Sequence, residues 1–150
     1  MQFDRLVTAV DRWAAKNADL EVLAQIGRSQ YRPMAMRWVE LLPPNDYVRA
    51  FTNAEVVVSH AGMGTVISAA EHMKPLIVMP RRGDLRETRS DHQIHTARWL
   101  PARRGIRVVM DAEELDSALN ARGLIESPEE QSVDRRAALI RVIGAFIESG

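Results

Sequence analysis

The chain of 150 residues contains no cysteine. This absence excludes a disulfide framework, a thiolate nucleophile, a zinc finger and an iron–sulfur cluster. There is also no apolar run near the roughly 18–20 residues that cross a bilayer, and no signal-peptide pattern. Apolar residues make up 46% of the chain and charged residues 27%, which excludes disorder and collagen-like repeats. We therefore expect a cytoplasmic globular protein, with residues 1–150 forming one domain around its own core.

The chain lacks net charge as well, but its charges are unevenly distributed. Residues 1–80 are balanced, with eight basic and eight acidic groups. Residues 81–110 hold eight arginines against three acids, giving +5, and residues 111–150 hold four arginines against nine acids, giving −5. Base composition and solvated faces are one explanation. The other is a site for a diphosphate or a charged partner, because arginine is well shaped for phosphate. So localised a basic segment does not indicate a general nucleic-acid binder.

Helices and strands are expected to alternate along the chain. Apolar periodicity and turn residues predict helices over residues 3–17, 45–53, 64–73, 91–103, 112–121 and 128–148, and strands over 21–27, 36–42, 55–62, 75–80 and 107–111. We expect residues 21–27 to form a short buried strand. We also expect Asn45 or Asp46 to cap the second helix after Pro43-Pro44 has ended the preceding strand.

The strands in the middle of the chain indicate the fold class. Residues 56–58 and 76–79 are continuous apolar runs rather than alternating ones. Such runs are typical of parallel strands buried on both faces, so the fold class is α/β with a doubly wound parallel sheet. Domains of this kind usually open with a strand, whereas this chain opens with a helix. Either the first strand is missing or another element covers its position.

Two segments at the carboxyl ends of strands, where such sheets bind ligands, contain unusual residues. The first is SHAGMGT at 59–65, whose glycines let backbone approach a ligand before a helix N-terminus that suits phosphate. It is neither a Walker loop nor a dinucleotide fingerprint. The alternative is a tight strand-to-helix turn that needs glycine for its geometry.

The second segment is PRRGDLRETRSDHQ at 80–93. Its four arginines precede Asp91, His92 and Gln93, whose side chains can bind neighbouring sugar hydroxyls. The alternative is a solvated loop that ends in a helix cap at Ser90 or Asp91. We expect no metal site, because the one close histidine pair, His92 and His95, has no evident third ligand.

The ordered set SHAGMGT, KPLIVMPR and DHQ resembles the C-terminal, donor-binding domain of glycosyltransferase family 28. It is most similar to the small subunits of two-part transferases, namely bacterial exopolysaccharide enzymes and the eukaryotic enzyme that extends dolichol-linked N-acetylglucosamine. The opening FDRLVTAVD also looks like the first helix of those subunits. Relatives of this type place a strand and a glycine turn before that helix, whereas here Met1-Gln2 precede it. The resemblance thus implies half of a two-domain GT-B transferase fold, Rossmann-like and without its first strand.

The resemblance also implies roles for particular residues. The donor diphosphate would face His60, Gly62, Gly64 and Thr65. Ser68 stands where many relatives hold the ribose with a glutamate, and Glu71 lies one turn further on. Asp91, His92 and Gln93 match the motif that contacts the donor sugar, and residues 42–46 match the stretch that lines the uracil. Arg81 and Arg82 are candidates for contact with the diphosphate or with a partner.

The function that the resemblance implies is inverting, metal-independent transfer of a sugar from a UDP-sugar to a lipid-linked acceptor. No cofactor is expected, since the UDP-sugar is a substrate. No residue stands out as the general base, which would come with the acceptor site from a membrane-anchored partner subunit that recruits the chain to the inner face of the membrane. The alternative is a non-catalytic subunit that binds the sugar nucleotide or stabilises its partner. An epimerase-like domain would need acidic catalytic residues that are not evident.

Overall fold

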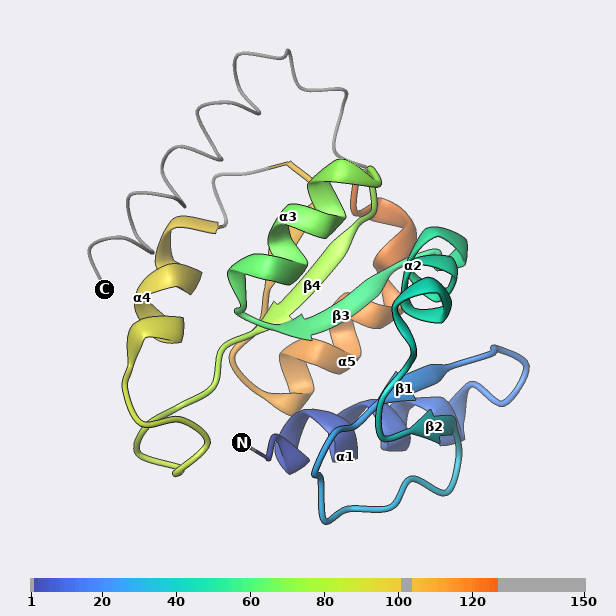
Figure 1. Ribbon diagram of the computed structural model, residues 1–150, viewed down its shortest axis with the longest axis horizontal. Helices are drawn as coiled ribbons and strands as arrows, with labels where there is room; N and C mark the ends of the chain where they lie inside the picture. Colours follow the sequence, from blue (N-terminus) through green and yellow to red (C-terminus); the bar gives the residue numbers. More distant parts are fainter. Residues whose placement is uncertain (1, 101–103, 127–150) are drawn as a thin grey trace.

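The computed structural model describes residues 2–100 and 104–126 (Figure 1). In chain order the elements are α1 (Asp4–Lys16), β1 (Leu23–Gln25), β2 (Arg37–Val39), α2 (Pro44–Asn53), β3 (Val57–His60), α3 (Met63–Glu71), β4 (Leu76–Met79), α4 (His92–Trp99), β5 (Ile106–Val108), α5 (Ala112–Asn120) and a 3-10 turn at Arg122–Leu124. The predicted alternation is confirmed, although each strand is shorter than expected. The helix predicted over 128–148 lies outside the described residues, as do residues 101–103 of the helix predicted over 91–103.

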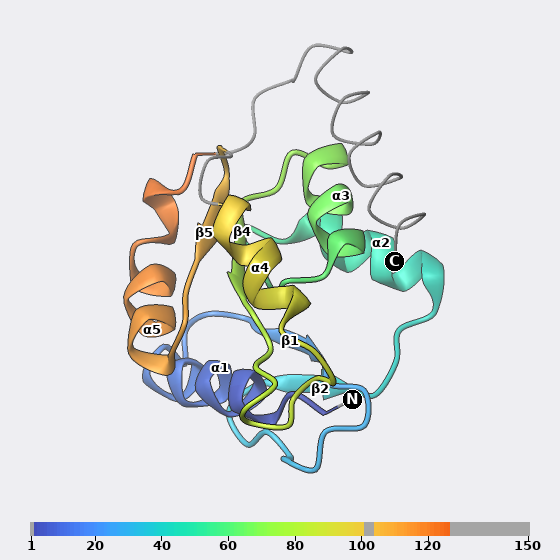
Figure 2. The same ribbon diagram turned by 90° about the vertical axis from the view of Figure 1, so that its left-hand side faces the viewer.

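The larger sheet is parallel, with strand order β3-β4-β5. The side chains of β4 alternate between two hydrophobic clusters. Ile77 and Met79 pack with α1 and α5, while Leu76 and Val78 pack with residues of α2, α3 and α4. Figure 2 shows these two groups of helices on opposite sides of the sheet. Because all four β4 residues are fully buried between the two layers, the doubly wound α/β fold is confirmed.

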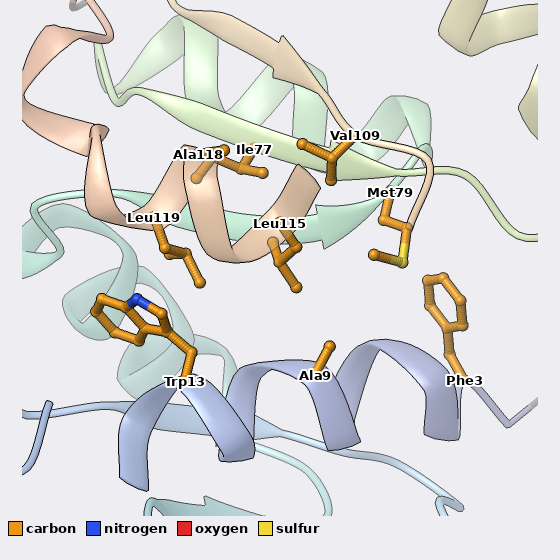
Figure 3. Packing of buried hydrophobic residues seen from close by; sticks show 9 residues of the cluster. All are labelled: Phe3, Ala9, Trp13, Ile77, Met79, Val109, Leu115, Ala118 and Leu119. Atoms are coloured by element: carbon orange, nitrogen blue, oxygen red, sulfur yellow. The ribbon is translucent and has the colours of Figure 1, made fainter. Parts of the chain in front are cut away.

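The cluster beneath β4 joins the first helix to the last described one. Figure 3 shows Ala9 and Trp13 of α1 facing Leu115 and Leu119 of α5, while Ala118 lies next to Ile77 of β4. At the far end of α1, the indole Nε1 of Trp13 donates to Oδ1 of Asn120 at 2.8 Å. The helical spacing of apolar residues in FDRLVTAVDRW thus produces the buried face that the sequence predicts.

The strands form two sheets rather than one. β1 and β2 pair in parallel with each other, and among the described residues neither pairs with β3. The expectation of a buried strand over 21–27 is therefore wrong, since Leu23 is 38% exposed and Gln25 is also exposed. Within residues 2–100 and 104–126, β1 has a neighbouring strand on one edge alone and so lacks the cover that a central strand receives.

Carboxylates of α1 hold the loop between β1 and β2. Asp11 is 4% exposed and accepts hydrogen bonds from the hydroxyl of Tyr31 at 2.6 Å and from the backbone N–H groups of Met34 and Ala35. Two turns earlier, Asp4 accepts from the hydroxyl of Ser29 and the N–H of Gln30. The first helix thus anchors the smaller sheet through polar contacts as well as through packing.

The helix cap expected at Asn45 or Asp46 is wrong, and the cap at Asp91 that the alternative interpretation required does not form. α2 begins at Pro44, with no side-chain cap at Pro43, because proline suits the first helical position. α4 has Asp91 at its N-cap position, but the carboxylate does not cap the helix. Its Oδ1 accepts from the backbone N–H of Gly83 at 3.1 Å instead, which ties the preceding loop to the helix start.

Replacing Asp11 tests the anchoring of this loop. Burial by itself raises the pKa of Asp11, but the hydrogen bonds from Tyr31, Met34 and Ala35 outweigh it, so the pKa lies below the ordinary 3.8. The ionised carboxylate therefore stabilises the fold at neutral pH, and this contribution is lost as the pH falls through the native pKa. We expect Asp11→Asn to lower the free energy of unfolding by about 2 kcal/mol at pH 7, measured by denaturant titration.

The difference between Asp11→Asn and the unmodified chain should shrink below about pH 4, where the carboxylate begins to protonate. Asp19→Asn is the matched control, because Asp19 is exposed and lies outside the loop that Asp11 holds. A loss of stability that is the same at pH 7 and pH 3 would contradict the account.

Candidate functional site

The carboxyl ends of β3, β4 and β5 lie along one edge of the larger sheet. His60, the last residue of β3, pairs in register with Met79, the last residue of β4. The turn into α3 follows the first strand, and the loop over residues 80–91 follows the second. Ligands of parallel α/β sheets bind at this edge. The candidate site is therefore built from the end of β3, the start of α3 and the loop after β4.

The turn between β3 and α3 presents backbone N–H groups. Gly62 is the N-cap of α3 and provides no side-chain cap, so the first N–H groups of the helix have no partner within it. A Cβ atom added at Gly62 would overlap with Cε1 of His60 and lie 3.0 Å from its Nδ1, whereas one at Gly64 would meet no atom within 4 Å. Glycine at 62 accommodates the imidazole, while the space beside Gly64 is open, and Thr65 follows it in the first turn.

His60 is partly buried, and its surroundings favour the neutral imidazole. Burial lowers its pKa, the guanidinium of Arg81 lowers it further, and a hydrogen bond with the Gln93 side chain opposes both. Its Nδ1 is buried without a hydrogen-bond partner. Because a buried polar atom without a partner is energetically costly, this nitrogen is a natural contact for a ligand.

Arg81 carries the second unpartnered atom, its buried Nε. Burial lowers the pKa of the guanidinium, and the carboxylate of Glu87 partly offsets this. The backbone N–H of Arg81 donates to Oε1 of Gln93 at 3.0 Å. His60 Nδ1 and Arg81 Nε are the two buried side-chain atoms of the described residues that lack a hydrogen bond, and they belong to neighbouring strand ends.

Arg82 has a different environment from its neighbour. Its guanidinium makes two hydrogen bonds to the carboxylate of Asp84, at 3.0 and 2.7 Å, in an exposed pair. The Asp84 contact raises the pKa of Arg82. The sequence suggests Arg81 and Arg82 as equal candidates. In the structure Arg82 forms an ion pair with Asp84, whereas the buried Nε of Arg81 has no hydrogen-bond partner.

The remaining predicted residues lie on α4 and α3. Gln93 connects His60 to the backbone of Arg81, and Asp91 is bonded to Gly83. His92 is exposed at the start of α4. In α3, Ser68 is partly buried and Glu71 is exposed in the last turn, so the structure does not bring this carboxylate to the start of the helix.

Sequence reasoning missed the residues that hold the edge together. The guanidinium of Arg5 donates to both oxygens of Glu87, at 2.7 and 2.9 Å, and to the carbonyls of Pro80 and Met110. Glu87 Oε2 also accepts from the backbone N–H of Arg82. The one signal in the sequence was Glu87, a single glutamate among arginines. Local sequence does not show that it pairs with Arg5, 82 residues away.

Two further properties concern metals and membranes. Among residues 2–100 and 104–126, no three or more histidine, aspartate or glutamate side chains gather where they could hold a metal ion. In the same part of the chain, no helix is long and apolar enough to cross a membrane.

These features define a class of protein: a Rossmann-like α/β domain with its candidate site at the carboxyl ends of the strands of a parallel sheet. Residues 1–137 match the glycosyltransferase family 28 C-terminal domain, and the chain belongs to this family. The fold is accordingly that of the Rossmann-like half of a GT-B glycosyltransferase.

One curated relative is the UDP-N-acetylglucosamine–N-acetylmuramyl-(pentapeptide) pyrophosphoryl-undecaprenol N-acetylglucosamine transferase of Deinococcus deserti. It is 32% identical over 138 residues, which cover 87% of this chain and 35% of the relative. The chain thus spans about a third of the length of that transferase. No solved structure gives a significant match.

The two glycines of the β3–α3 turn should respond differently to the same substitution. Gly62→Ala places a methyl group against the partly buried imidazole of His60, which must move. The substitution should therefore lower the free energy of unfolding by about 1–3 kcal/mol. Gly64→Ala places its methyl group in open space and should leave stability unchanged or slightly higher. Denaturant unfolding of both variants checks this. Equal losses at the two positions would contradict the described packing.

Proposed function

We propose that the carboxyl edge, meaning the edge of the larger sheet formed by the carboxyl ends of β3, β4 and β5, binds the diphosphate of a UDP-sugar. The chain would then be the donor-binding part of a glycosyltransferase acting on a lipid-linked acceptor. The observation that carries this proposal is the pair of buried, unpartnered atoms, His60 Nδ1 and Arg81 Nε, beside an uncapped helix N-terminus. A neutral imidazole, a guanidinium and backbone N–H groups together suit an anion. Family membership and the activity named for the Deinococcus relative support a sugar nucleotide as that anion.

The proposed reaction is an inverting displacement. An acceptor hydroxyl oxygen attacks the anomeric carbon, the bond from that carbon to the diphosphate oxygen breaks, and UDP leaves from the opposite face. The hydroxyl proton passes to a general base, which we assign to the acceptor-binding half. Negative charge grows on the departing diphosphate, where the positive end of the α3 dipole and Arg81 stabilise it. These groups supply the required positive charge without a metal ion.

The proposed roles follow the geometry of the edge. His60, the N–H groups of the turn from Gly62 to Thr65, and Arg81 face the diphosphate. Ser68 remains the candidate for the ribose, with Glu71 as the alternative. We assign the donor sugar to the start of α4, where His92 is exposed. There the Gln93 side chain hydrogen-bonds to His60 and to the backbone N–H of Arg81. One carboxylate oxygen of Asp91 accepts from the backbone N–H of Gly83.

We further propose that an acceptor-binding partner at the inner face of a membrane completes the enzyme. Support for a lipid-linked acceptor comes from the name of the Deinococcus relative, which includes one. The alternative is a non-catalytic subunit that binds a sugar nucleotide and stabilises its partner. Ser68 favours that alternative, because a hydroxyl holds ribose hydroxyls less firmly than a carboxylate does.

A transfer assay separates these two functions. Sugar transfer from radiolabelled UDP-N-acetylglucosamine to a polyprenyl-diphosphate acceptor is measured with the chain alone, with its acceptor-binding half, and with that half alone. We expect transfer only when both are present, and loss of transfer with Arg81→Ala. Transfer by the acceptor-binding half alone, at a rate that the chain does not change, would favour the non-catalytic subunit.

The two neighbouring arginines provide a matched test of donor binding. Arg81→Ala removes the uncommitted guanidinium and should weaken UDP binding about 10-fold or more, as expected for a charge-assisted contact. Arg82→Ala removes a guanidinium already paired with Asp84, so the affinity should change by less than about 2-fold. His60→Ala should also weaken binding. Calorimetry with UDP measures all three, and equal effects of the two arginine variants would exclude Arg81 from the site.

A further inference from the structure

The guanidinium of Arg81 lies over an aromatic ring. The guanidinium carbon of Arg81 lies 5.3 Å from the centre of the Phe3 ring, and that of Arg5 lies 5.4 Å from the same ring. The quadrupole of an aromatic face attracts a cation at such a distance. The ring of Phe3, next to the start of α1, is therefore close to two guanidinium groups, one from Arg5 of α1 and one from Arg81 after β4.

The two arginines differ in what else they bind. Arg5 makes four hydrogen bonds, to both oxygens of Glu87 and to two backbone carbonyls. Arg81 has no ion pair among the described residues, and its buried Nε has no partner. Glu87, the acid that acts on Arg81 through space, is already engaged by Arg5.

This difference has a chemical consequence. A carboxylate holds a guanidinium by accepting its N–H groups, which then cannot bind another anion. An aromatic ring holds the cation through its face and leaves those N–H groups unused. Support by Phe3 thus keeps Arg81 in place with its hydrogen-bonding capacity intact.

The ring itself is buried in the hydrophobic core. Phe3 is 6% exposed and packs with the cluster beneath β4. Figure 3 shows its ring next to Met79, the last residue of β4, two residues before Arg81. The start of α1 is therefore adjacent to the strand end from which Arg81 projects.

We propose that Phe3 is a positioning residue of the donor site, whose ring holds the Arg81 guanidinium at the carboxyl edge with its N–H groups available to the diphosphate. This inference rests on the proposed function, because it assumes that Arg81 binds that diphosphate. Phe3 does not touch the ligand and acts only through Arg81. Its contribution should therefore concern the phosphates and not the nucleoside.

Calorimetry of the full chain with UDP and with uridine tests the inference. Phe3→Leu should weaken UDP binding about 3- to 10-fold, the range expected for a cation–aromatic contact, and leave uridine binding unchanged. In the Arg81→Ala background, Phe3→Leu should have no further effect on UDP. Ring-fluorinated phenylalanines at position 3, which weaken the negative face with little change in volume, should lower UDP affinity step by step.

The outcomes distinguish a failure of the proposed function from a failure of the inference about Phe3. If the unmodified chain binds no UDP, the proposed function fails and the inference fails with it. If the chain binds UDP but Phe3→Leu weakens uridine and UDP equally, or the fluorinated series is flat, the inference alone is overturned. Arg122→Ala is the matched control, because it removes a guanidinium 5.7 Å from the Trp13 ring, towards the other end of α1, and should leave UDP affinity unchanged.

Discussion

The carboxyl edge of the larger sheet depends on one buried ion pair, between Arg5 and Glu87. A single guanidinium binds the carboxylate of the loop after β4, the carbonyl of Pro80 at the end of that strand, and the carbonyl of Met110 after β5. Both side chains are largely shielded, with 23% and 10% exposed. Removing either partner would leave a shielded charge or carbonyl unsatisfied, which is costly. The loop that presents Arg81 is fixed because Arg5 satisfies several groups at once.

The first turn of α1 therefore does more than begin a helix. Three consecutive residues reach three different parts of the molecule: Phe3 supports Arg81, Asp4 holds the loop after β1, and Arg5 holds the loop after β4. A helix on the back of the sheet thereby organises the ligand edge. Under the proposed function, Arg81 can remain uncommitted because Arg5 and Glu87 satisfy each other. The same arrangement explains why Arg81 and Arg82, adjacent in a segment of +5 charge, have such different environments.

The sequence predicted much of this architecture, and the parts that it missed share a physical cause. The valine run before His60 and the run LIVM after Pro75 predicted parallel strands, because continuous burial leaves a strong local signal. The glycines after β3 likewise predicted a turn into a helix. The exposure of β1, the two separate sheets and the Arg5–Glu87 pair depend on contacts between distant segments, which local periodicity does not encode. Asp91 shows the same limit. Local sequence explains an aspartate at the N-cap position of α4, but it does not predict that the carboxylate accepts from the backbone N–H of Gly83.

The central claim is that His60, the start of α3 and Arg81 form one anion site. Its most direct test is a nuclear magnetic resonance titration of the isotope-labelled chain with UDP-N-acetylglucosamine. The account predicts the largest changes at the backbone amides of residues 62–65, the imidazole of His60 and the Nε–H of Arg81, with little change at Arg82. Saturable changes centred elsewhere, or none at these groups, would contradict it.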